Sequence, residues 1–593
     1  MKIVIRLFAV CALTACAHHG GGGDDDTTNA TLSIDPPSSE LVLTNGAAAH
    51  ATFTATLTLP DNTTRDVTAH TTFSLDSTYG AFNANELEVN VAGKVQVVGT
   101  YNDKSGNKMG TAEVIARVRS VRVDPSLPPA TADMFGGTED ASLAPKIVYP
   151  PADAVMPRNL GDFEIHWTDD HANNVFEISL KTGYSDVRVY VQGGNGLAAA
   201  GPSASWSAFK AEEWLAAVGM EKTVTFQVRG VNMATPGKVG AAAPQDIQLS
   251  NEEMLGGLYY WASASSNLIN SAIGIFRHDM SRPGQPAEEY LTTNQLNGRC
   301  VACHVLSRDG TKMAITYDGG SDPATMVDVA TRKEATPKAA WDFGTFTPDN
   351  TQFISVEDGD LVVRDVATQN VLATLAGTTS VSQPDLSPDG TKLVYVTNPD
   401  NNHDWDFPNG HIYLRTYDQA THTFGTEQRL VAVDGENNYY PSWSPDGTWI
   451  VFNKDTTGGT TYDNLNSTTW VVKADGTKPP VQLAKADQAA GLTNSWVRWA
   501  PFPQTLGAAG EPMFWITMSS KRDFGVRLHN TGLPQRPVTG TPGKTAQLWM
   551  TPFFPDRALQ GQDPSANAFR LPFQNLDSSN HIAQWTQRVV VLQ

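Results

Sequence analysis

Apolar and polar residues alternate with a period of two through most of this chain. Residues 51–59, for example, read Ala-Thr-Phe-Thr-Ala-Thr-Leu-Thr-Leu and are followed by Pro60-Asp-Asn62. Such alternation predicts a β-strand with one buried face, and the Pro-Asp-Asn that follows predicts a turn. We therefore expect residues 30–122 to form a β-sandwich.

Four further strand-like segments lie between residues 146 and 248, at 163–167, 175–180, 187–191 and 224–228. Their spacing predicts a second sandwich. The Pro-rich residues 125–129 belong to a stretch, 123–145, that we expect to be a linker between the two sandwiches. His166 and His171 fall on a predicted strand and its adjoining loop, where we do not expect metal ligands.

The remaining segment, 250–593, contains an internal repeat. Leu-Ser-Arg-Asp-Gly-Thr-Lys at 306–312 recurs as Leu-Ser-Pro-Asp-Gly-Thr-Lys at 386–392 and as Trp-Ser-Pro-Asp-Gly-Thr-Trp at 443–449, with a degenerate copy at 346–352 and a fifth start at Ala500. The copies begin roughly 40 to 60 residues apart, and strand-like units at such a period predict a β-propeller.

The repeated Ser-Pro-Asp-Gly fits a type I turn, with Pro presetting φ at the second position and Gly at the fourth. Each copy is therefore expected to join the first two strands of a blade. Five copies plus residues 258–290 predict six blades. We expect residues 588–592, Arg-Val-Val-Val-Leu, to pair with that first segment and close the ring, which removes sheet edges.

These segments resemble known families. Residues 30–122, with the order SIDPPSSELVLTNG, DNTTRDVTAHTTFSL and AGKVQVVGTYND, resemble bacterial Ig-like domains, which act as spacers or adhesive modules. Residues 146–248 resemble a fibronectin type III or Ig-like sandwich, and the Ser-Pro-Asp-Gly copies resemble the blades of TolB-like propellers. The resemblance implies an all-β chain of two sandwiches and a C-terminal six-bladed propeller.

Composition and charge agree with this organisation. A chain of 593 residues exceeds what one core supports, and 49 Gly and 36 Pro favour short strands and turns over long helices. The formal net charge is -20. Such a surface repels phosphate backbones, so we expect no nucleic-acid partner. We expect a monomer.

The N-terminus predicts export. Residues 1–15 combine Lys2 and Arg6 with an apolar run too short to span a membrane, as in a signal peptide. The sequence LTAC, ending at Cys16, resembles a lipobox, which implies cleavage before Cys16 and acylation of its thiol. An ordinary secretory leader is the alternative. Residues 16–29 predict a flexible tether, and Ala17 after the lipidated residue favours the outer membrane, at the periplasmic or cell-surface side.

Residues 300–304, Cys-Val-Ala-Cys-His, form the one motif whose spacing carries chemistry. Two thiols three positions apart can add to the vinyl groups of one haem, and the adjacent imidazole can reach the iron. The motif resembles the c-type haem attachment sequence, which implies a covalent haem c with thioethers at Cys300 and Cys303 and His304 as the proximal ligand. A small disulfide loop and half of a zinc site are the alternatives.

The distal ligand of such a haem stays open. Met313 is near in sequence but takes the blade position of Leu393 and Ile450, which favours a core side chain. His581 comes near the motif if the ring closes as predicted. The remaining candidates are Met254, Met280 and His278, or an open iron position.

Two other segments have features of binding sites. Residues 400–411 form an acidic, aromatic loop in which Trp405 could stack on a sugar ring, although a solvated insertion fits as well. Residues 540–545 resemble a phosphate-binding loop only superficially and are rejected. The sequence contains no GxSxG or HExxH motif, so no hydrolase signature accompanies the propeller.

Together these observations predict an exported, lipid-anchored haem c protein that transfers electrons to a redox partner protein, on a propeller scaffold. Catalysis is not expected; if there is any, the protein is a haem redox enzyme. The alternative is a haem-free protein of the cell envelope that recognises a protein or a polysaccharide.

Overall fold

The computed structural model describes residues 27–201, 203–264, 272–317, 323–335, 339–375, 380–398, 405–489, 491–535 and 543–592. Two compact units make up the chain. The first consists mainly of residues up to 115, and the second contains residues 116–593 with two short earlier segments. No helix within the described ranges is long and apolar enough to cross a membrane.

The first unit is built from short antiparallel strands, as the alternating pattern predicts. Its strands are β1 (Thr31–Asp35), β2 (Ser38–Thr44), β3 (Ala49–Thr52), β4 (Thr54–Thr58), β5 (Thr64–Asp66), β6 (Thr71–Ser74), β7 (Gly80–Asn83), β8 (Glu86–Val89), β9 (Gly93–Asp103) and the long β10 (Gly106–Val123). Phe53, Phe73 and Phe82 meet in its core with ring centroids 5.5 to 6.5 Å apart. The prediction of an all-β unit made of short strands is confirmed, whereas its Ig-like character stays a prediction.

The second unit begins with the other predicted sandwich. All four expected strands are present, as β14 (Phe163–Thr168), β15 (Val175–Lys181), β16 (Ser185–Gln192) and β18 (Thr223–Val231). They are joined by β12 (Lys146–Tyr149), β13 (Val155–Met156), β17 (Ser205–Phe209), α1 (Ala211–Val218), β19 (Lys238–Ala241) and β20 (Gln245–Leu249). The final residues of β10, from Val118 to Val123, pair in parallel with β16.

The stretch expected to be a linker, 123–145, is instead part of this unit. It holds short 3-10 helices at Pro129–Gly136 and Ala141–Leu143, and the two-residue strand β11 (Thr138–Glu139). Leu127 and Phe135 are buried in a cluster with Tyr190. Burial of these two apolar side chains stabilises the segment against the sandwich. The prediction of a linker rested on the Pro content and did not take them into account.

Residues 257–586 form the propeller, and the part of the chain that the structure describes contains six blades, with the innermost strand of each given first. The first blade is β47 (Ser578–Thr586), β21 (Gly257–Ala264), β22 (Gly274–Asp279) and β23 (Glu288–Thr292); the second is β24 (Val301–Leu306), β25 (Lys312–Tyr317), β26 (Pro323–Asp328), β27 (Lys333–Glu334) and β28 (Ala339–Ala340); the third is β29 (Gly344–Phe346), β30 (Gln352–Glu357), β31 (Asp360–Asp365) and β32 (Val371–Leu375).

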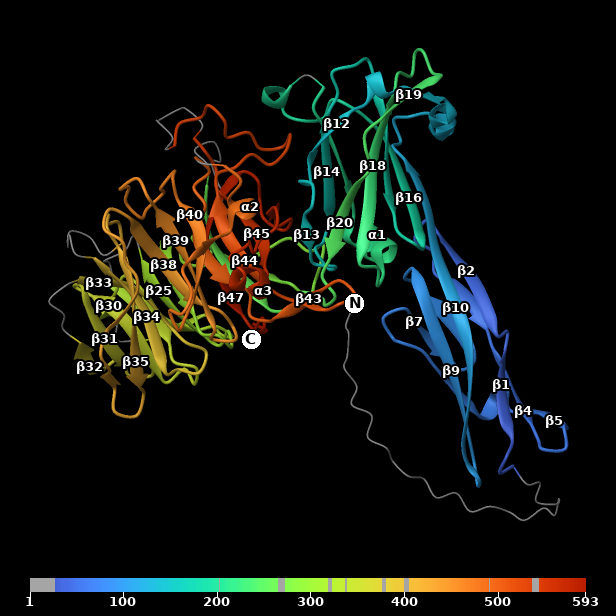
Figure 1. Cartoon of the computed structure of the whole chain (residues 1–593), viewed down its shortest axis with the longest axis horizontal. Coiled ribbons are helices and arrows are strands. Elements are labelled where there is room, and N and C mark those ends of the chain that lie inside the picture. Colours follow the sequence, from blue (N-terminus) through green and yellow to red (C-terminus); the bar gives the residue numbers. More distant parts are fainter. Residues whose placement is uncertain are drawn as a thin grey trace. The chain divides into compact units, whose positions relative to one another are not determined.

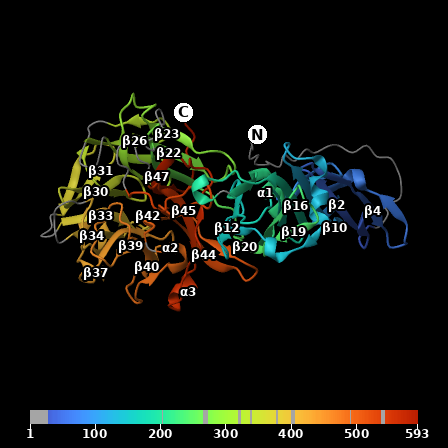
Figure 2. The same cartoon turned by 90° about the horizontal axis from the view of Figure 1, so that it is seen from above.

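The other three blades follow the same order. The fourth is β33 (Ser380–Leu386), β34 (Lys392–Asn398), β35 (His411–Asp418), β36 (Thr423–Phe424) and β37 (Gln428–Val431); the fifth is β38 (Asn437–Trp443), β39 (Trp449–Asp455), β40 (Thr468–Lys473) and β41 (Val481–Gln482); the sixth is β42 (Ser495–Trp499), β43 (Gln504–Leu506), β44 (Glu511–Ser520), β45 (Gln547–Phe553) and β46 (Phe569–Arg570). Two short helices, α2 (Ala484–Asp487) and α3 (Pro555–Leu559), complete the propeller. Figures 1 and 2 show its blades following one another in chain order, from green through yellow to red.

The repeated turns join the first two strands of the blades, as predicted. In the Ser387–Gly390 turn, the Gly390 N–H donates to the Ser387 carbonyl at 2.9 Å, and the Asp389 carboxylate accepts from the Ser387 hydroxyl. Gly390 has φ +74. In the degenerate copy Asn350 takes this place with φ +60, which asparagine tolerates better than most residues.

Ring closure by the C-terminus is confirmed, but the predicted strand is wrong. The closing strand is β47, which pairs with β21, whereas residues 588–592 form no strand. The phase of the repeat explains the difference. Thr586 takes the place of the turn residues Ser307 and Ser387, so the innermost strand must end there, and the apolar residues Val590 and Leu592 pack against the first two blades instead.

Candidate functional site

Each innermost strand contributes one residue to each of two rings around the propeller axis. Counting back from the turn residue of each blade, the fourth residue gives the plug ring, which is Cys303, Phe343, Gln383, Tyr440, Trp496 and Ile582. The second residue back gives the wall ring, which is Val305, Thr345, Asp385, Ser442, Arg498 and Gln584. All six wall residues and five plug residues line one cavity, which we call the arginine cavity.

A β-bulge aims the plug ring at the axis. Pairing with the second strand shifts register at this level in five of the six innermost strands within the described ranges. Gln383, Tyr440, Trp496 and Ile582 each have φ between +51 and +55. A bulge adds a residue to one strand and redirects its side chain. Trp496 stacks on Tyr440 with ring centroids 4.0 Å apart, and both pack with Phe343 and Ile582 across the axis.

The predicted haem motif lies on one of these bulged strands. His304 lies inside β24, where it pairs with Ile315. Val301 pairs with Tyr317, so Ala302 and Cys303 together stand opposite the single residue Thr316. Cys303 belongs to the plug ring, and Cys300 precedes the first residue of β24. Both cysteines are present as half-buried thiols.

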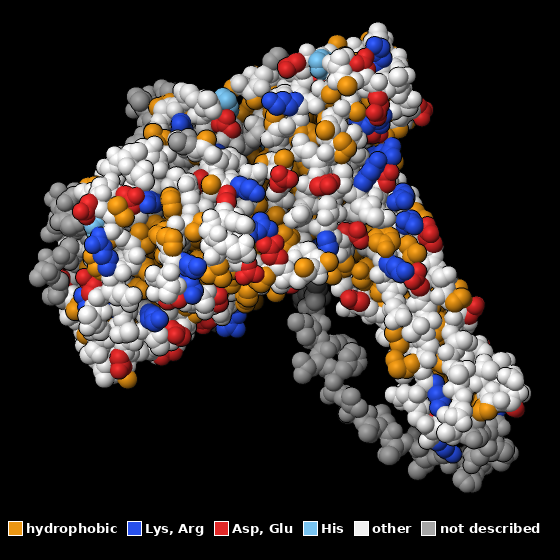
Figure 3. All heavy atoms as spheres, in the orientation of Figure 1, with side chains coloured by type: hydrophobic (Ala, Val, Ile, Leu, Met, Phe, Trp, Pro, Cys, Tyr) orange, Lys and Arg blue, Asp and Glu red, His pale blue; other side chains and the backbone are white. Residues whose placement is uncertain are grey.

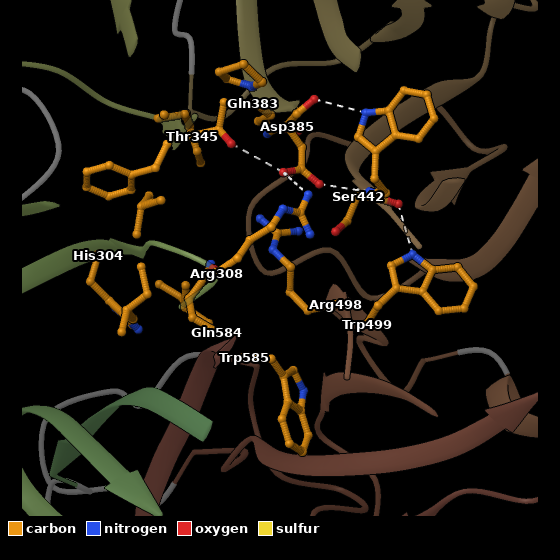
Figure 4. Close-up of a pocket in the computed structure, with 18 of the residues that line it drawn as sticks. His304, Arg308, Thr345, Gln383, Asp385, Ser442, Arg498, Trp499, Gln584 and Trp585 are labelled. Carbon is orange, nitrogen blue, oxygen red and sulfur yellow. Dashed lines mark hydrogen bonds and ion pairs between the residues drawn. The ribbon is translucent and has the colours of Figure 1, made fainter. Parts of the chain in front are cut away.

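His304 follows the bulge and lies on the other face of β24. The same position in the sixth and first blades is held by Val497 and Ala583, both fully buried. His304 is 2% exposed, and neither ring nitrogen has a hydrogen bond of good geometry within the described ranges, although the backbone at Tyr259 and Ala302 is near enough to oppose the pKa shift. Burial lowers the pKa of His304 to about 4, which keeps the imidazole neutral at pH 7. In Figure 4 its ring lies at the edge of the cavity, apart from the arginine side chains at the centre.

The residues of this strand do not fit a haem held as the motif predicts. Thioethers from Cys300 and Cys303 and an axial bond from His304 require the two thiols and the imidazole to face one porphyrin. On β24 the adjacent Cys303 and His304 face opposite sides of the strand. The arginine cavity beside Cys303 measures about 140 Å³, below the roughly 300 Å³ at which small-molecule sites begin.

Charged side chains concentrate in the arginine cavity. Arg498 comes from the wall ring, and Arg308 stands at the turn position that proline holds in the next four blades. Figure 4 shows both guanidinium groups meeting at the centre beneath Asp385. Arg308 Nη2 donates to the Leu386 carbonyl at 2.5 Å and lies 4.0 Å from Asp385 Oδ1.

Asp385 already has donors on both carboxylate oxygens. Oδ2 accepts the Trp443 backbone N–H at 2.8 Å, and Oδ1 accepts the Thr345 hydroxyl at 3.4 Å. The Arg498 guanidinium, by contrast, makes a single hydrogen bond within the described ranges, from Nη1 to the carbonyl of Val497. Burial lowers the pKa of Arg498, and the charge of Asp385 opposes that shift. At pH 7 the guanidinium stays charged.

The cavity floor adds another donor. Gln383 is 4% exposed, and its Oε1 accepts the Tyr440 N–H at 2.6 Å. Its Nε2 has no hydrogen-bond partner in the described part of the chain. Arg308, Arg498 and Gln383 therefore present N–H groups to one small space. Two carboxylates, Asp342 and Asp385, also line it, and Asp385 accepts hydrogen bonds from the protein on both oxygens.

A second cavity, of about 570 Å³, lies beyond the plug ring. Trp496 and Ile582 line both cavities and separate them. Trp261, Tyr462 and Trp496 supply aromatic rings, so we call it the aromatic cavity. His581 also lines it, pairs with Trp261 across β47 and β21, and shares a hydrogen bond with Ser579 at 2.6 Å. Burial lowers the pKa of His581 to about 3.

The other predicted site residues lie elsewhere. Met313 is fully buried in the core cluster between the first two blades, as its repeat position favours. Met254, Met280 and His278 are buried, and the His278 ring stacks on Phe573 at 4.0 Å. Cys16 and residues 399–404 lie outside the described residues, so the lipid anchor stays a prediction.

Sequence reasoning did not single out Arg308, Arg498 or Gln383. A signal was present, since Arg308 replaces proline inside an otherwise regular turn copy, and Arg498 lies in the Val-Arg-Trp-Ala-Pro start that was recognised. Only the alignment of all six copies reveals that alternate positions meet at one axis.

Comparisons with known proteins give the chain no family. No family model matches it, and no curated protein does. Among solved structures it is similar to a putative TolB from Agrobacterium tumefaciens, at 15% identity over 56% of this chain and 99% of that one, with a TM-score of 0.30. It is also similar to the Kuenenia stuttgartiensis hydrazine synthase, at 16% identity over 46% of this chain and 67% of that one, with a TM-score of 0.29.

Proposed function

We propose that this chain is an exported binding protein whose propeller holds a carboxylate group of its ligand in the arginine cavity. The observation that carries the proposal is Arg498, a charged side chain in a cavity, whose guanidinium makes one hydrogen bond within the described ranges, to the carbonyl of the preceding residue Val497. A guanidinium offers five N–H donors in a planar fork that matches a carboxylate.

The hydrogen-bond donors of the cavity, rather than its net charge, favour an anion. Two arginines are balanced by two aspartates, Asp342 and Asp385, and Asp385 already accepts from Trp443 and Thr345. The unpartnered Gln383 Nε2 adds a neutral donor. A cavity of about 140 Å³ admits a single small group, so the rest of the ligand would lie outside.

An envelope partner is consistent with the predicted export and lipid anchor at Cys16. Charge on the remaining surface is mixed, since Figure 3 shows acidic and basic side chains interspersed over the visible face of the propeller. With a net charge of -20, that surface does not attract anions in general. Binding of a carboxylate would therefore depend on the cavity.

Calorimetric titration of the full mature chain tests the proposal. The probes are acetate, succinate and short peptides with either a free or an amidated C-terminus. We expect the free carboxylates to bind, amidation to abolish peptide binding, and Arg498→Gln to weaken binding at least tenfold. Arg588→Gln, at an exposed arginine outside the cavity, is the matched control. Equal binding by Arg498→Gln and the parent protein, or no binding by any carboxylate, refutes the proposal.

Covalent haem c, with electron transfer, is the second candidate, and the complete Cys-Val-Ala-Cys-His sequence is what favours it. The test is a pyridine haemochrome spectrum of protein matured with a cytochrome c assembly system. A covalent haem lost in Cys300→Ser and Cys303→Ser supports this candidate. If the matured protein is colourless, the haem candidate is refuted and the binding function is the one that remains.

A further inference from the structure

We propose that the aromatic cavity is a second binding site, for an uncharged carbohydrate ring. Its volume of about 570 Å³ lies within the range of small-molecule sites. It is separated from the arginine cavity by the plug ring, where Trp496 stacks on Tyr440. The two cavities can therefore take ligands of different chemistry.

Two buried hydroxyls point to a polar ligand. Ser495 on β42 and Ser519 on β44 pair in register, line the cavity, and are each 2% exposed. Neither Oγ has a hydrogen-bond partner within the described ranges. Unsatisfied buried hydroxyls are rare in folded proteins and call for a partner. A ligand hydroxyl can both donate to and accept from each serine.

The aromatic side chains provide stacking surfaces. Tyr462 lines the cavity and is 44% exposed, and its ring centroid lies 5.6 Å from that of Trp405, which is 40% exposed. The Thr461 hydroxyl donates to the Trp405 carbonyl at 2.8 Å, which ties the two loops together. Inside the cavity Trp261 is positioned by a 2.7 Å hydrogen bond from Nε1 to the Val301 carbonyl. Such rings offer apolar faces to the C–H groups of a sugar.

The charged side chains of this cavity balance one another. Lys521, 5% exposed, forms a 2.5 Å ion pair with Asp463, and among the described residues the lining holds one further lysine and one further aspartate. His581 is neutral at pH 7 because burial lowers its pKa to about 3. The lining thus has no net charge, and its groups suit a neutral hydroxylated ligand rather than an anion.

The inference is tested on the full mature chain by calorimetry and saturation-transfer NMR. The probes are glucose, galactose and N-acetylglucosamine, and their oligomers of two to four rings. We expect saturable binding of at least one probe, weakened roughly two- to tenfold by Tyr462→Ala and by Ser519→Ala, since each removes one contact. Leu372→Ala, at a similarly exposed side chain on β32, is the matched control and should bind normally.

One variant distinguishes the sugar site from the carboxylate site. Arg498→Gln should keep sugar binding while losing carboxylate binding. If no probe binds the folded parent protein, or if Tyr462→Ala and Ser519→Ala both bind as the parent does, the aromatic cavity is not a carbohydrate site. Circular dichroism confirms that each variant is folded before it is titrated.

Discussion

Replacing Asp385 by asparagine tests whether the ligand of the arginine cavity is an anion. The carboxylate lies 4.0 Å from Arg308, with side chains 22% and 35% exposed, so the pair contributes at most about 1 kcal/mol to stability after screening by solvent. Asparagine keeps an oxygen that can accept the Trp443 N–H. We therefore expect Asp385→Asn to fold and to lose about 1 kcal/mol or less.

The same substitution raises the net charge of the cavity by one. For an anion bound about 6 Å from position 385, at an effective dielectric constant of about 40 to 80, the lost repulsion is worth about 0.7 to 1.4 kcal/mol. Carboxylates should thus bind Asp385→Asn about three- to tenfold more tightly. The gain should shrink between about 20 mM and about 300 mM salt, because ions screen the interaction.

Calorimetric titration of acetate at both salt concentrations measures this gain. Asp385→Ala is the companion variant, because it also removes the acceptor of the buried Trp443 N–H, which costs about 1–3 kcal/mol. We expect Asp385→Ala to be less stable than Asp385→Asn and to bind carboxylates no more tightly than Asp385→Asn does. If Asp385→Asn bound carboxylates more weakly than the parent protein, the Asp385 side chain would have to contact the ligand favourably, and the anion site would be refuted.

Three further predictions concern the stability of the propeller. Burial holds the pKa of His304 near 4 in the folded chain, against about 6.5 when unfolded, so stability should fall by up to about 3 kcal/mol as pH drops from about 6.5 to about 4; urea unfolding of His304→Val should show a shallower pH dependence, and an unchanged slope contradicts the assignment. Met313→Ala should lose about 2–5 kcal/mol and Met313→Leu less than about 1.5, because Met313 is fully buried; equal stability of both variants would place the side chain outside the core. Gly390→Ala should destabilise more than Gly447→Ala in thermal melts, because both glycines have positive φ but a Cβ at 390 would lie 3.0 Å from Pro348 Cδ, whereas at 447 the nearest atom is 3.6 Å away; the reverse order would contradict this packing.

The blades could be predicted from sequence because their information is local. Ser387, Asp389 and Gly390 specify a turn by their own hydrogen bonds and φ preference, and the turns mark the strand ends. The closing strand could not be read from apolar content alone. Residues 588–592 are more apolar than Ser578–Thr586, but only the latter are in phase with the repeat.

The site could be predicted less well because it depends on strand faces. A Cys-X-X-Cys-His sequence has the same spacing in any conformation, whereas the side on which each residue lies depends on the bulge at Ala302 and Cys303. The cavities raise the same difficulty. Arg308, Gln383 and Arg498 are far apart in sequence and come together only because three blades share one axis.

The position of His304 bears on both candidate functions, carboxylate binding and covalent haem. At this place in the blade the other five copies carry Gly344, Pro384, Pro441, Val497 and Ala583, none of which has a polar side chain. An imidazole buried there without a hydrogen bond of good geometry is costly to desolvate, and a small apolar residue would avoid that cost. The imidazole is thus a poor choice for packing alone, whereas a haem thioether-linked to Cys300 and Cys303 would need it. That haem would also require His304 to leave the face of β24 on which it is buried, so the matured protein can have the paired strand or the ligated haem, but not both at once.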